Sequence, residues 1–280
     1  MTLAIETAPL RSLFLLNRSV PDPAVYARIA EIEQPWIDGL LAELEAETDP
    51  VPSRAAWLDL LDAQLQAEAA DLGSLAYLAH EASYEEFRTF VLEFGPDGLT
   101  EAQNFFPAIA RVPIKAQLAL MRVLIDEFGC GNLQQSHSYL YIKLLAELGL
   151  PTELDQVLEH TSEPTFAFMN AFYWLAQRAP HVEYFLGALA YLEASIPPAF
   201  SLLAEGCLRL GIQNGAYYSE HVHIDAFHMK EMQTAIREHE VVHGLDATKV
   251  WIGAKLLSRV LGEAVENAVE RARSTADAGR

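Results

Sequence analysis

Cysteine and basic residues are both scarce in this chain of 280 residues. Its two cysteines, Cys130 and Cys207, lie far apart and have no CxxC spacing, which argues against a disulfide framework and against a thiolate metal site. Nineteen lysines and arginines stand against 39 aspartates and glutamates, for a formal net charge of −20. Because such a charge repels phosphate groups, we expect no nucleic-acid partner and no membrane partner.

Targeting signals are missing as well. The first 20 residues include an apolar run at residues 13–16, but no basic segment and no cleavage site of small residues. We find no apolar stretch that reaches the ~18 residues needed to span a bilayer. Together with the low cysteine content, these absences predict a soluble, cytoplasmic protein.

The apolar pattern predicts an all-α fold. Apolar residues recur at three- and four-residue intervals along most of the chain, and β-branched alternation is almost absent. We expect a single helical domain over residues 1–280, made of N-terminal helices (1–98), a core (99–273) and a frayed polar tail (274–280). Helices of this length most simply form a bundle, in which a site is built from inward-facing side chains.

Proline and glycine clusters should separate the helices. The segments 95–98 and 197–198 are two such clusters, and both are predicted to be breaks. Helices are accordingly expected at 100–111 after the first break, and at 181–194 and 198–211 on either side of the second.

One stretch has the spacing of a metal site. His221, Asp225 and His228 form the pattern H-x3-D-x2-H, and on a helix these offsets fall within a sector of roughly 60°. Imidazole and carboxylate groups are ligands of iron, manganese or zinc. This helix is therefore the first candidate for chemistry, and the core at 99–273 is predicted to bind metal.

Four further polar residues could complete the site. Glu193 lies inside a long apolar run, where a buried glutamate is costly without a partner of opposite charge. Glu101, Glu127 and His137 stand at the edges of apolar helical segments. Each residue alone is compatible with an ordinary surface or helix-end position. Taken together with the histidine-rich helix, they favour a metal site.

A second motif competes for the metal. Residues 239–243 read His-Glu-Val-Val-His, the HExxH signature of zinc metalloproteases, in which Glu240 would act as general base. No metzincin continuation follows Gly244, and no sheet is predicted. The 18 residues of helix between His221 and His239 would span about 27 Å, so the two motifs cannot share a metal. A zinc hydrolase is retained as a remote alternative.

The candidate residues resemble those of a known family, the heme-oxygenase-like diiron oxidases and oxygenases, over roughly residues 100–231. The His221 helix matches the family's H-x3-D-x2-H helix, and Glu193 precedes Pro197 as in its Glu-x-x-x-Pro context. Glu127, followed by two glycines and then by His137, is similar to another of its segments. The resemblance implies a heme-oxygenase-like bundle of about seven core helices plus N-terminal helices.

The resemblance also implies a ligand set. The six core metal ligands would be Glu101, His137, Glu193, His221, Asp225 and His228. Glu93 is a weaker alternative to Glu101. Glu127 resembles the additional carboxylate that amine N-oxygenases bring to the metals, so it is both a candidate ligand and the candidate catalytic residue.

The implied enzyme is an O2-dependent non-heme diiron oxidoreductase with two Fe(II) ions as cofactor and O2 as co-substrate. Glu127 favours N-oxygenation of an amino acid, an amine or a guanidine. The alternative is oxidative C–C cleavage, decarboxylation or desaturation of an amino or fatty acid. An external electron donor and a homodimer are compatible with this interpretation. A heme oxygenase is disfavoured because no histidine precedes His80.

Overall fold

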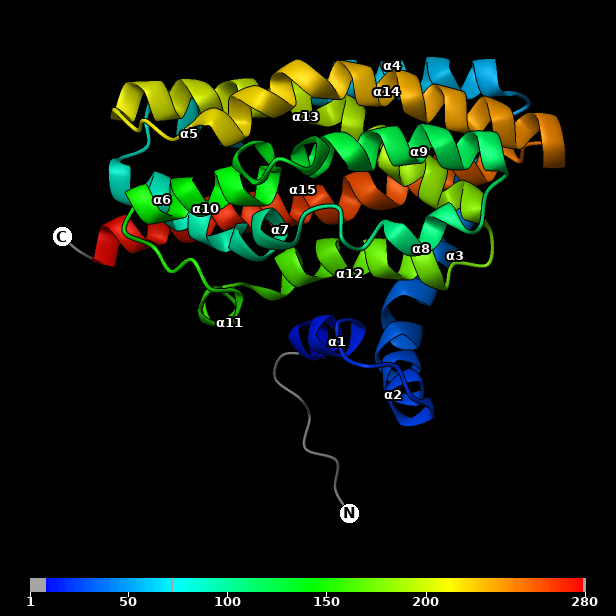
Figure 1. The fold of residues 1–280 in the computed structure, drawn as a ribbon, viewed down its shortest axis with the longest axis horizontal. Helices are drawn as coiled ribbons and strands as arrows, with labels where there is room; N and C mark the ends of the chain where they lie inside the picture. The colour runs from blue at the N-terminus through cyan, green and yellow to red at the C-terminus, as the bar shows by residue number, and fades with distance from the viewer. Residues whose placement is uncertain (1–8, 72, 279–280) are drawn as a thin grey trace.

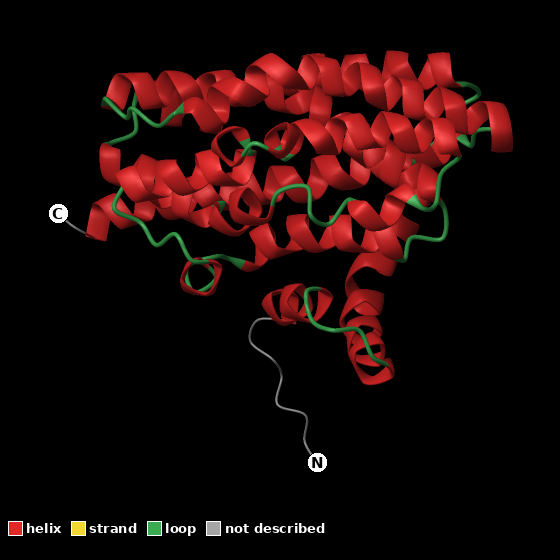
Figure 2. Cartoon of the chain, viewed as in Figure 1, coloured by secondary structure: helices red, strands yellow, loops and turns green. Residues whose placement is uncertain are grey.

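The computed structural model describes residues 9–71 and 73–278, and every regular element in these residues is helical (Figure 2). The all-α prediction is therefore confirmed. In chain order the α-helices are α1 (Pro9–Asn17), α2 (Pro23–Glu33), α3 (Gly39–Glu47), α4 (Arg54–Ala69), α5 (Gly73–His80), α6 (Tyr84–Glu93), α7 (Gly95–Thr100), α8 (Phe106–Ile109), α9 (Ile114–Glu127), α10 (His137–Glu147), α11 (Leu154–Val157), α12 (Glu163–Gln177), α13 (Val182–Leu210), α14 (Ala216–His243) and α15 (Ala247–Ala278). A π-helical segment, η1 (Gln34–Asp38), links α2 to α3, and two short 3₁₀ turns, η2 (Gly129–Gly131) and η3 (Leu133–Gln135), link α9 to α10.

Three long helices form the centre of the bundle. Helix α13 packs against both α14 and α15, while α9 lies along α14 and α12 lies along α15 (Figure 1). The apolar faces of these helices make one large core, and burial of such faces is the main source of helix stability in a protein.

Two glycines allow α13 and α15 to approach closely. A Cβ atom added to Gly187 would lie 1.8 Å from the carbonyl oxygen of Val250, and one added to Gly253 would lie 2.0 Å from that of Tyr184. No side chain fits at either position, so the two helix backbones meet directly here.

The N-terminal helices are held on α12. The backbone N–H of Leu10 donates to Glu163, and Arg178 donates to both Glu33 and Asn17. Figure 1 shows α1 and α2 lying beside α12, outside the main layers of the bundle.

The predicted break at residues 197–198 is wrong. Pro197 and Pro198 lie inside α13, which runs unbroken for 29 residues. An interior proline costs about 3 kcal/mol because it removes a backbone hydrogen bond, but the buried N-terminal half of α13 packs between two long helices, and this packing overrides the local penalty. The carbonyl groups of Glu193 and Ala194 lose their usual N–H partners four residues ahead.

The predicted helix at 100–111 is also wrong. The segment expected to be a break forms α7, since Pro96 sits in its first turn, where a missing N–H costs nothing. The chain then leaves the helix at Glu101, which has ψ of 136°, and Ala102 has a positive φ of 60°. Glu101 is therefore presented from an irregular segment between α7 and α8.

Two further expectations about chain segments are changed by the structure. Helix α13 is long and apolar enough to cross a membrane by length and composition, so the expectation that no such stretch exists is wrong. Many of its apolar side chains pack inside the bundle, and a buried core helix passes the same test. Helix α15 continues to Ala278, beyond Arg273, where helix was expected to end; residues 279–280 lie outside the described part.

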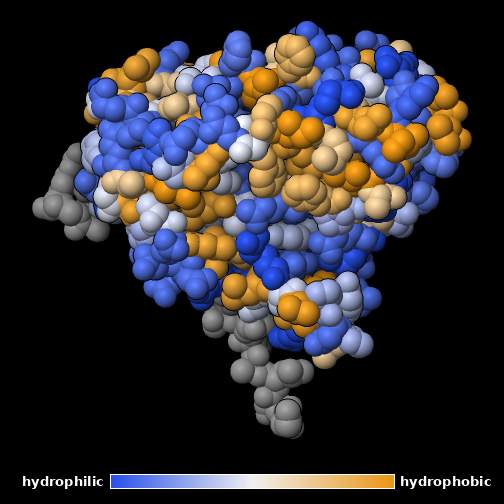
Figure 3. All heavy atoms as spheres, in the orientation of Figure 1, coloured by the Kyte–Doolittle hydropathy of each residue, from blue (hydrophilic) through white to orange (hydrophobic). Residues whose placement is uncertain are grey.

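Exposed apolar residues gather on α9. Ile114, Leu118 and Ile125 are 67%, 53% and 47% exposed, and Figure 3 shows apolar side chains on the face of the molecule where α9 lies. The opposite face of α9 carries the site residue Glu127, which is buried at the end of the helix.

Candidate metal centre

The structure brings all seven predicted site residues together inside the bundle. Glu127 is the last residue of α9, His137 is the first of α10, and Glu193 comes from the middle of α13. His221, Asp225 and His228 project from one face of α14, and all three are at most 2% exposed. Glu101 reaches the same place from the segment after α7.

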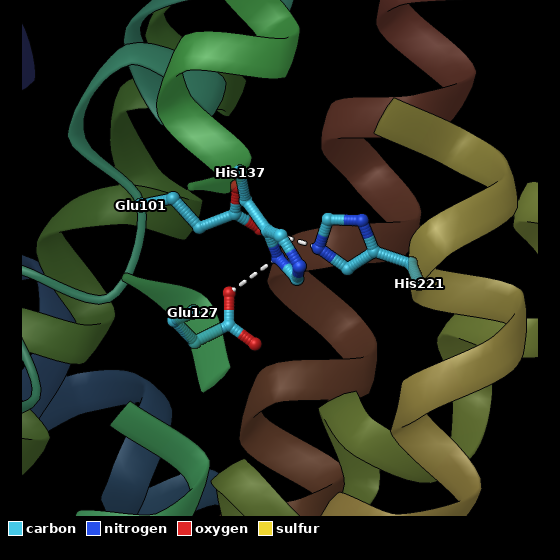
Figure 4. Close-up of side chains that lie close together, drawn as sticks. All are labelled: Glu101, Glu127, His137 and His221. Carbon is cyan, nitrogen blue, oxygen red and sulfur yellow. Dashed lines mark hydrogen bonds and ion pairs between the residues drawn. The ribbon is translucent and has the colours of Figure 1, made fainter. Parts of the chain in front are cut away.

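Four of these residues form a first group (Figure 4). Ligand atoms of Glu101, Glu127, His137 and His221 all lie within 4.8 Å of one another. His221 Nε2 is 2.8 Å from Glu101 Oε1, and His137 Nδ1 is 2.7 Å from Glu127 Oε2. Two imidazoles and two carboxylates thus converge on one point.

A second group lies next to the first and shares Glu127 with it. Ligand atoms of Glu127, Asp225 and His228 are again within 4.8 Å of one another. His228 Nδ1 lies 3.3 Å from Glu127 Oε1, 3.5 Å from Asp225 Oδ1 and 3.0 Å from Glu193 Oε2. Glu127 therefore turns one carboxylate oxygen toward each group, the arrangement of a bridging ligand.

Many polar atoms of this centre are buried without a hydrogen-bond partner. They are Glu101 Oε2, Glu127 Oε2, His137 Nδ1, both carboxylate oxygens of Asp225, and His228 Nε2. Leaving such an atom unpaired costs about 1–3 kcal/mol or more. Imidazole nitrogens and carboxylate oxygens are the ligand atoms that bind iron, manganese or zinc. The residues therefore fit a bound metal.

The neighbours of His221 orient it for metal binding. Its Nδ1 lies 2.7 Å from the carbonyl oxygen of Tyr217, one turn earlier on α14. A ring nitrogen that donates to a backbone carbonyl fixes the tautomer and leaves the other nitrogen free to bind metal. The Tyr217 hydroxyl also donates to Glu101 at 3.3 Å, so one residue positions two candidate ligands.

The crowding of carboxylates strongly perturbs their protonation. Burial raises the pKa of Asp225 to about 11, and the charges of Glu193 and Glu127 act in the same direction. Burial likewise raises the pKa of Glu101 and of Glu193, in each case with a contribution from Glu127. Without a cation, burial shifts the equilibrium of each of these carboxyl groups toward its protonated form.

The pKa values of Glu127 and His228 are shifted in the directions that favour the charged forms of these groups. Burial raises the pKa of Glu127, but the neighbouring His137, His221 and His228 outweigh burial and bring it down to about 2. Burial lowers the pKa of His228, but its hydrogen bond to Glu193 and the nearby negative charges bring it up to about 9. The anionic carboxylate at the centre of the site is therefore Glu127.

Glu93, the weaker alternative to Glu101, makes hydrogen bonds and an ion pair with residues outside the candidate centre. Its Oε1 accepts hydrogen bonds from the backbone N–H and the hydroxyl of Ser162 and from the hydroxyl of Thr165, and Arg271 pairs with its Oε2. Glu93 joins α6 to α12 and α15 and belongs to neither metal-ligand group.

Two residues of the HExxH motif, His239 and Glu240, form ion pairs with other side chains. The carboxylate of Glu240 accepts from Arg54 Nε at 2.8 Å, and His239 Nε2 lies 3.3 Å from Glu183. His239 and His243 belong to neither of the two ligand groups found among the described residues. The general base that a zinc hydrolase requires is thus neutralised by an arginine.

Asp97 is a site residue that the sequence did not reveal. It lies in α7, one turn before Glu101, and lines the same small cavity as Glu101, Glu127, Glu193 and His221. Burial raises its pKa to about 8, with a further contribution from Glu101. The Gly-Pro-Asp-Gly context made Asp97 look like a loop residue; its distance of one turn from a predicted ligand was the available signal.

Comparison with known proteins defines the class. Residues 88–262 match a family described as an iron-containing redox enzyme. The match covers more than half of the chain and includes the whole candidate centre, so the chain belongs to this family of iron-containing redox enzymes. This result confirms the expected family and supports iron as the metal of the protein.

One relative has a more specific name than the family. The chain is 27% identical over 209 residues to a nitrosourea synthase of Streptomyces achromogenes subsp. streptozoticus. The similarity covers 70% of this chain and 44% of the relative, so the chain spans less than half of the length of that protein.

Proposed function

We propose that this protein is an O2-dependent non-heme diiron oxygenase that adds oxygen to the nitrogen of an amine, an amino acid or a guanidine. The observation that carries the proposal is Glu127, whose two carboxylate oxygens face two adjacent groups of metal-ligand atoms. A shared carboxylate between two such groups is typical of two-metal centres.

The residues would divide between two Fe(II) ions. Glu101, His137 and His221 would hold the first ion, while Glu193, Asp225 and His228 would hold the second, with Glu127 between them. Bound iron would supply the activation of O2 in this site. The protein contributes the ligand geometry, the orientation of His221 by Tyr217 and an enclosing apolar wall that includes Phe168 and Phe172.

The proposed reaction balances with an external reductant. One oxygen atom of O2 becomes the hydroxyl group of an N–OH bond in place of N–H, and the other leaves as water. This outcome uses two electrons and two protons, so we propose a two-electron donor outside the chain. The name of the relative supports nitrogen chemistry, because a nitrosourea contains an N–O bond.

The mass of the product tests the reaction type. The iron-loaded protein is incubated with O2, a reductant and a panel of amines, amino acids and fatty acids, and the products are analysed by mass spectrometry. Gain of one oxygen atom on nitrogen supports N-oxygenation. Loss of two hydrogens, or of carbon dioxide, would overturn it in favour of desaturation or oxidative cleavage. The Glu127→Ala variant should give no product.

We propose that the chain folds as one domain and acts in the cytoplasm. The contacts of Glu163 and Arg178 with the N-terminal helices support a single cooperative unit. Calorimetry should show a single unfolding transition, and cell fractionation should find the protein in the cytoplasmic fraction. Sedimentation measures whether the chain forms a homodimer.

A further inference from the structure

Three cavities lie in series between the surface and the metal centre. The outer cavity, of about 450 Å³, is bordered by exposed residues such as Asp71 and Glu266. The middle cavity has about 90 Å³ and the inner cavity, at the metal centre, about 40 Å³. The outer and middle cavities share Leu75, Ser195, Ala199, Leu261 and Val265; the middle and inner cavities share Asp97, Phe168, Leu192, Ile196, Phe200 and Tyr217. The shared residues place the three cavities next to one another, in order from the surface to the metal centre.

The middle cavity is apolar apart from one carboxylate. Its polar lining groups are mostly satisfied: Tyr141 donates to the carbonyl oxygen of Val91, and Ser195 donates to that of Leu192. Among the described residues that line it, Asp97 is the only acidic one. Among the described residues, the carboxyl group of Asp97 makes no hydrogen bond and no ion pair, and its charged neighbours are Glu101, His221 and Glu127. It is therefore an acceptor without a donor, at the passage to the metal centre.

The charged side chains that line the outer and middle cavities are all acidic in the described part of the chain. No lysine or arginine lines any of the three cavities in the described part of the chain, whereas Glu68, Asp71 and Glu266 line the outer one. An anionic ligand would have to pass these carboxylates and enter the apolar chamber without a basic partner, which is costly. A cationic ligand is attracted to the opening and meets Asp97 at the inner end.

We propose that the substrate is a cationic amine with a compact apolar body and no carboxylate, and that Asp97 binds its ammonium group beside the metal centre. The inference rests on the proposed N-oxygenation, and it narrows the substrate from amino acids and amines in general to simple amines. Since one water-sized group needs about 10–15 Å³, the middle cavity holds an apolar body of roughly six to nine such groups.

Calorimetric titration of the Fe(II)-loaded protein without O2 tests the inference by binding alone. The probes are hexylamine, hexanoate and norleucine, which carries both an ammonium and a carboxylate, together with 1-hexanol as the neutral analogue. Hexylamine should bind at least about tenfold more tightly than hexanoate or norleucine. Its only charge is the ammonium group that would pair with Asp97, whereas hexanoate and norleucine carry a carboxylate that has no basic partner. Affinity should rise about fourfold per methylene from butylamine to hexylamine. Equal or tighter binding of hexanoate or norleucine would overturn the proposal.

Variants locate the binding group. Asp97→Asn should weaken hexylamine binding by about tenfold or more and leave 1-hexanol binding and iron content unchanged. Asp62→Asn, the same change at an exposed position of α4, should alter neither. Ala199→Leu narrows the passage between the outer and middle cavities and should weaken hexylamine binding more than methylamine binding. Unchanged hexylamine affinity in Asp97→Asn, or loss of iron from it, would contradict the assignment.

The same probes and variants distinguish failure of the proposed function from failure of the inference about Asp97. If hexylamine binds through Asp97 but no amine gains oxygen when O2 and reductant are added, the proposed function is wrong and the binding site stands. If an amino acid gains oxygen on nitrogen while hexylamine fails to bind, the proposed function stands and the inference about Asp97 is overturned.

Discussion

Glu127 Oε2 lies 2.7 Å from His137 Nδ1, within ion-pair distance. Because both groups are buried, a proton or a metal ion has to lie between or beside them to balance the charge of the carboxylate. The other oxygen of Glu127 faces His228 at 3.3 Å. The relationship between Glu127 and the histidines on both sides is the centre of the functional interpretation.

Removal of Glu127 should disturb both metal positions. Glu127→Ala takes one ligand from each group, so we expect most of the bound iron to be lost. Glu101→Gln touches only the first group and should lose one of the two ions. Iron analysis of anaerobically loaded protein measures this difference. Glu263→Gln, an exposed change on α15, serves as control; equal losses in Glu127→Ala and Glu101→Gln would contradict a shared ligand.

The stability of the metal-free protein should fall as pH rises from 6.5 to 9. The pKa of Asp225 is raised from 3.8 to about 11, and that of His228 from 6.5 to about 9. In this window the folded protein keeps protons that the unfolded chain releases, so the free energy of unfolding decreases with pH. The lowered pKa of Glu127 acts in the opposite direction, but only between about pH 2 and 4.5.

Urea unfolding at several pH values measures this slope, and Asp225→Asn should flatten it. Iron binding displaces the same protons, so iron should raise the melting temperature more at pH 8 than at pH 6.5. A metal-free protein whose stability rises across this window would contradict the assignment.

Glu93→Gln should reduce stability without reducing iron content. Glu93 is 2% exposed and accepts from Ser162 and Thr165 in addition to its pair with Arg271. The amide cannot satisfy all of these donors, so we expect a loss of about 1–3 kcal/mol in unfolding free energy. Chemical denaturation and iron analysis of the same preparation measure the two effects; loss of iron would return Glu93 to the ligand set.

Gly253→Ala should destabilise the α13–α15 contact. The added methyl group would meet the carbonyl of Tyr184 at 2.0 Å, and overpacking of this kind costs about 1–3 kcal/mol. Gly262, on the same helix, has no atom within 4 Å of an added Cβ, so Gly262→Ala should instead stabilise the helix by about 0.5–1 kcal/mol. Thermal melts of the two variants should therefore move in opposite directions.

The sequence predicted the site better than the helix boundaries. His221, Asp225 and His228 were found because a helix fixes the angle between residues four and seven apart, and Glu193 because a carboxylate inside an apolar run is unusual. Both features are local, and the structure places these residues together.

Helix boundaries depended on tertiary packing, which local rules do not include. Pro197 and Pro198 read as a break because of their backbone chemistry, whereas the packing of α13 keeps the helix intact. Glu101 was expected on a helix but lies on an irregular segment with Ala102 at positive φ. Asp97 was missed because its place beside the site depends mainly on the shape of a cavity lined from several helices.

Electron paramagnetic resonance of the iron-loaded, air-oxidised protein tests the central claim most directly. Two ferric ions that share the Glu127 carboxylate couple magnetically, so the account predicts that nearly all of the bound iron is silent in wild-type protein. The iron that remains in Glu127→Ala should give the signal of isolated ferric ions. A wild-type signal from isolated ferric ions that accounts for all of the bound iron would contradict a two-iron centre built around Glu127.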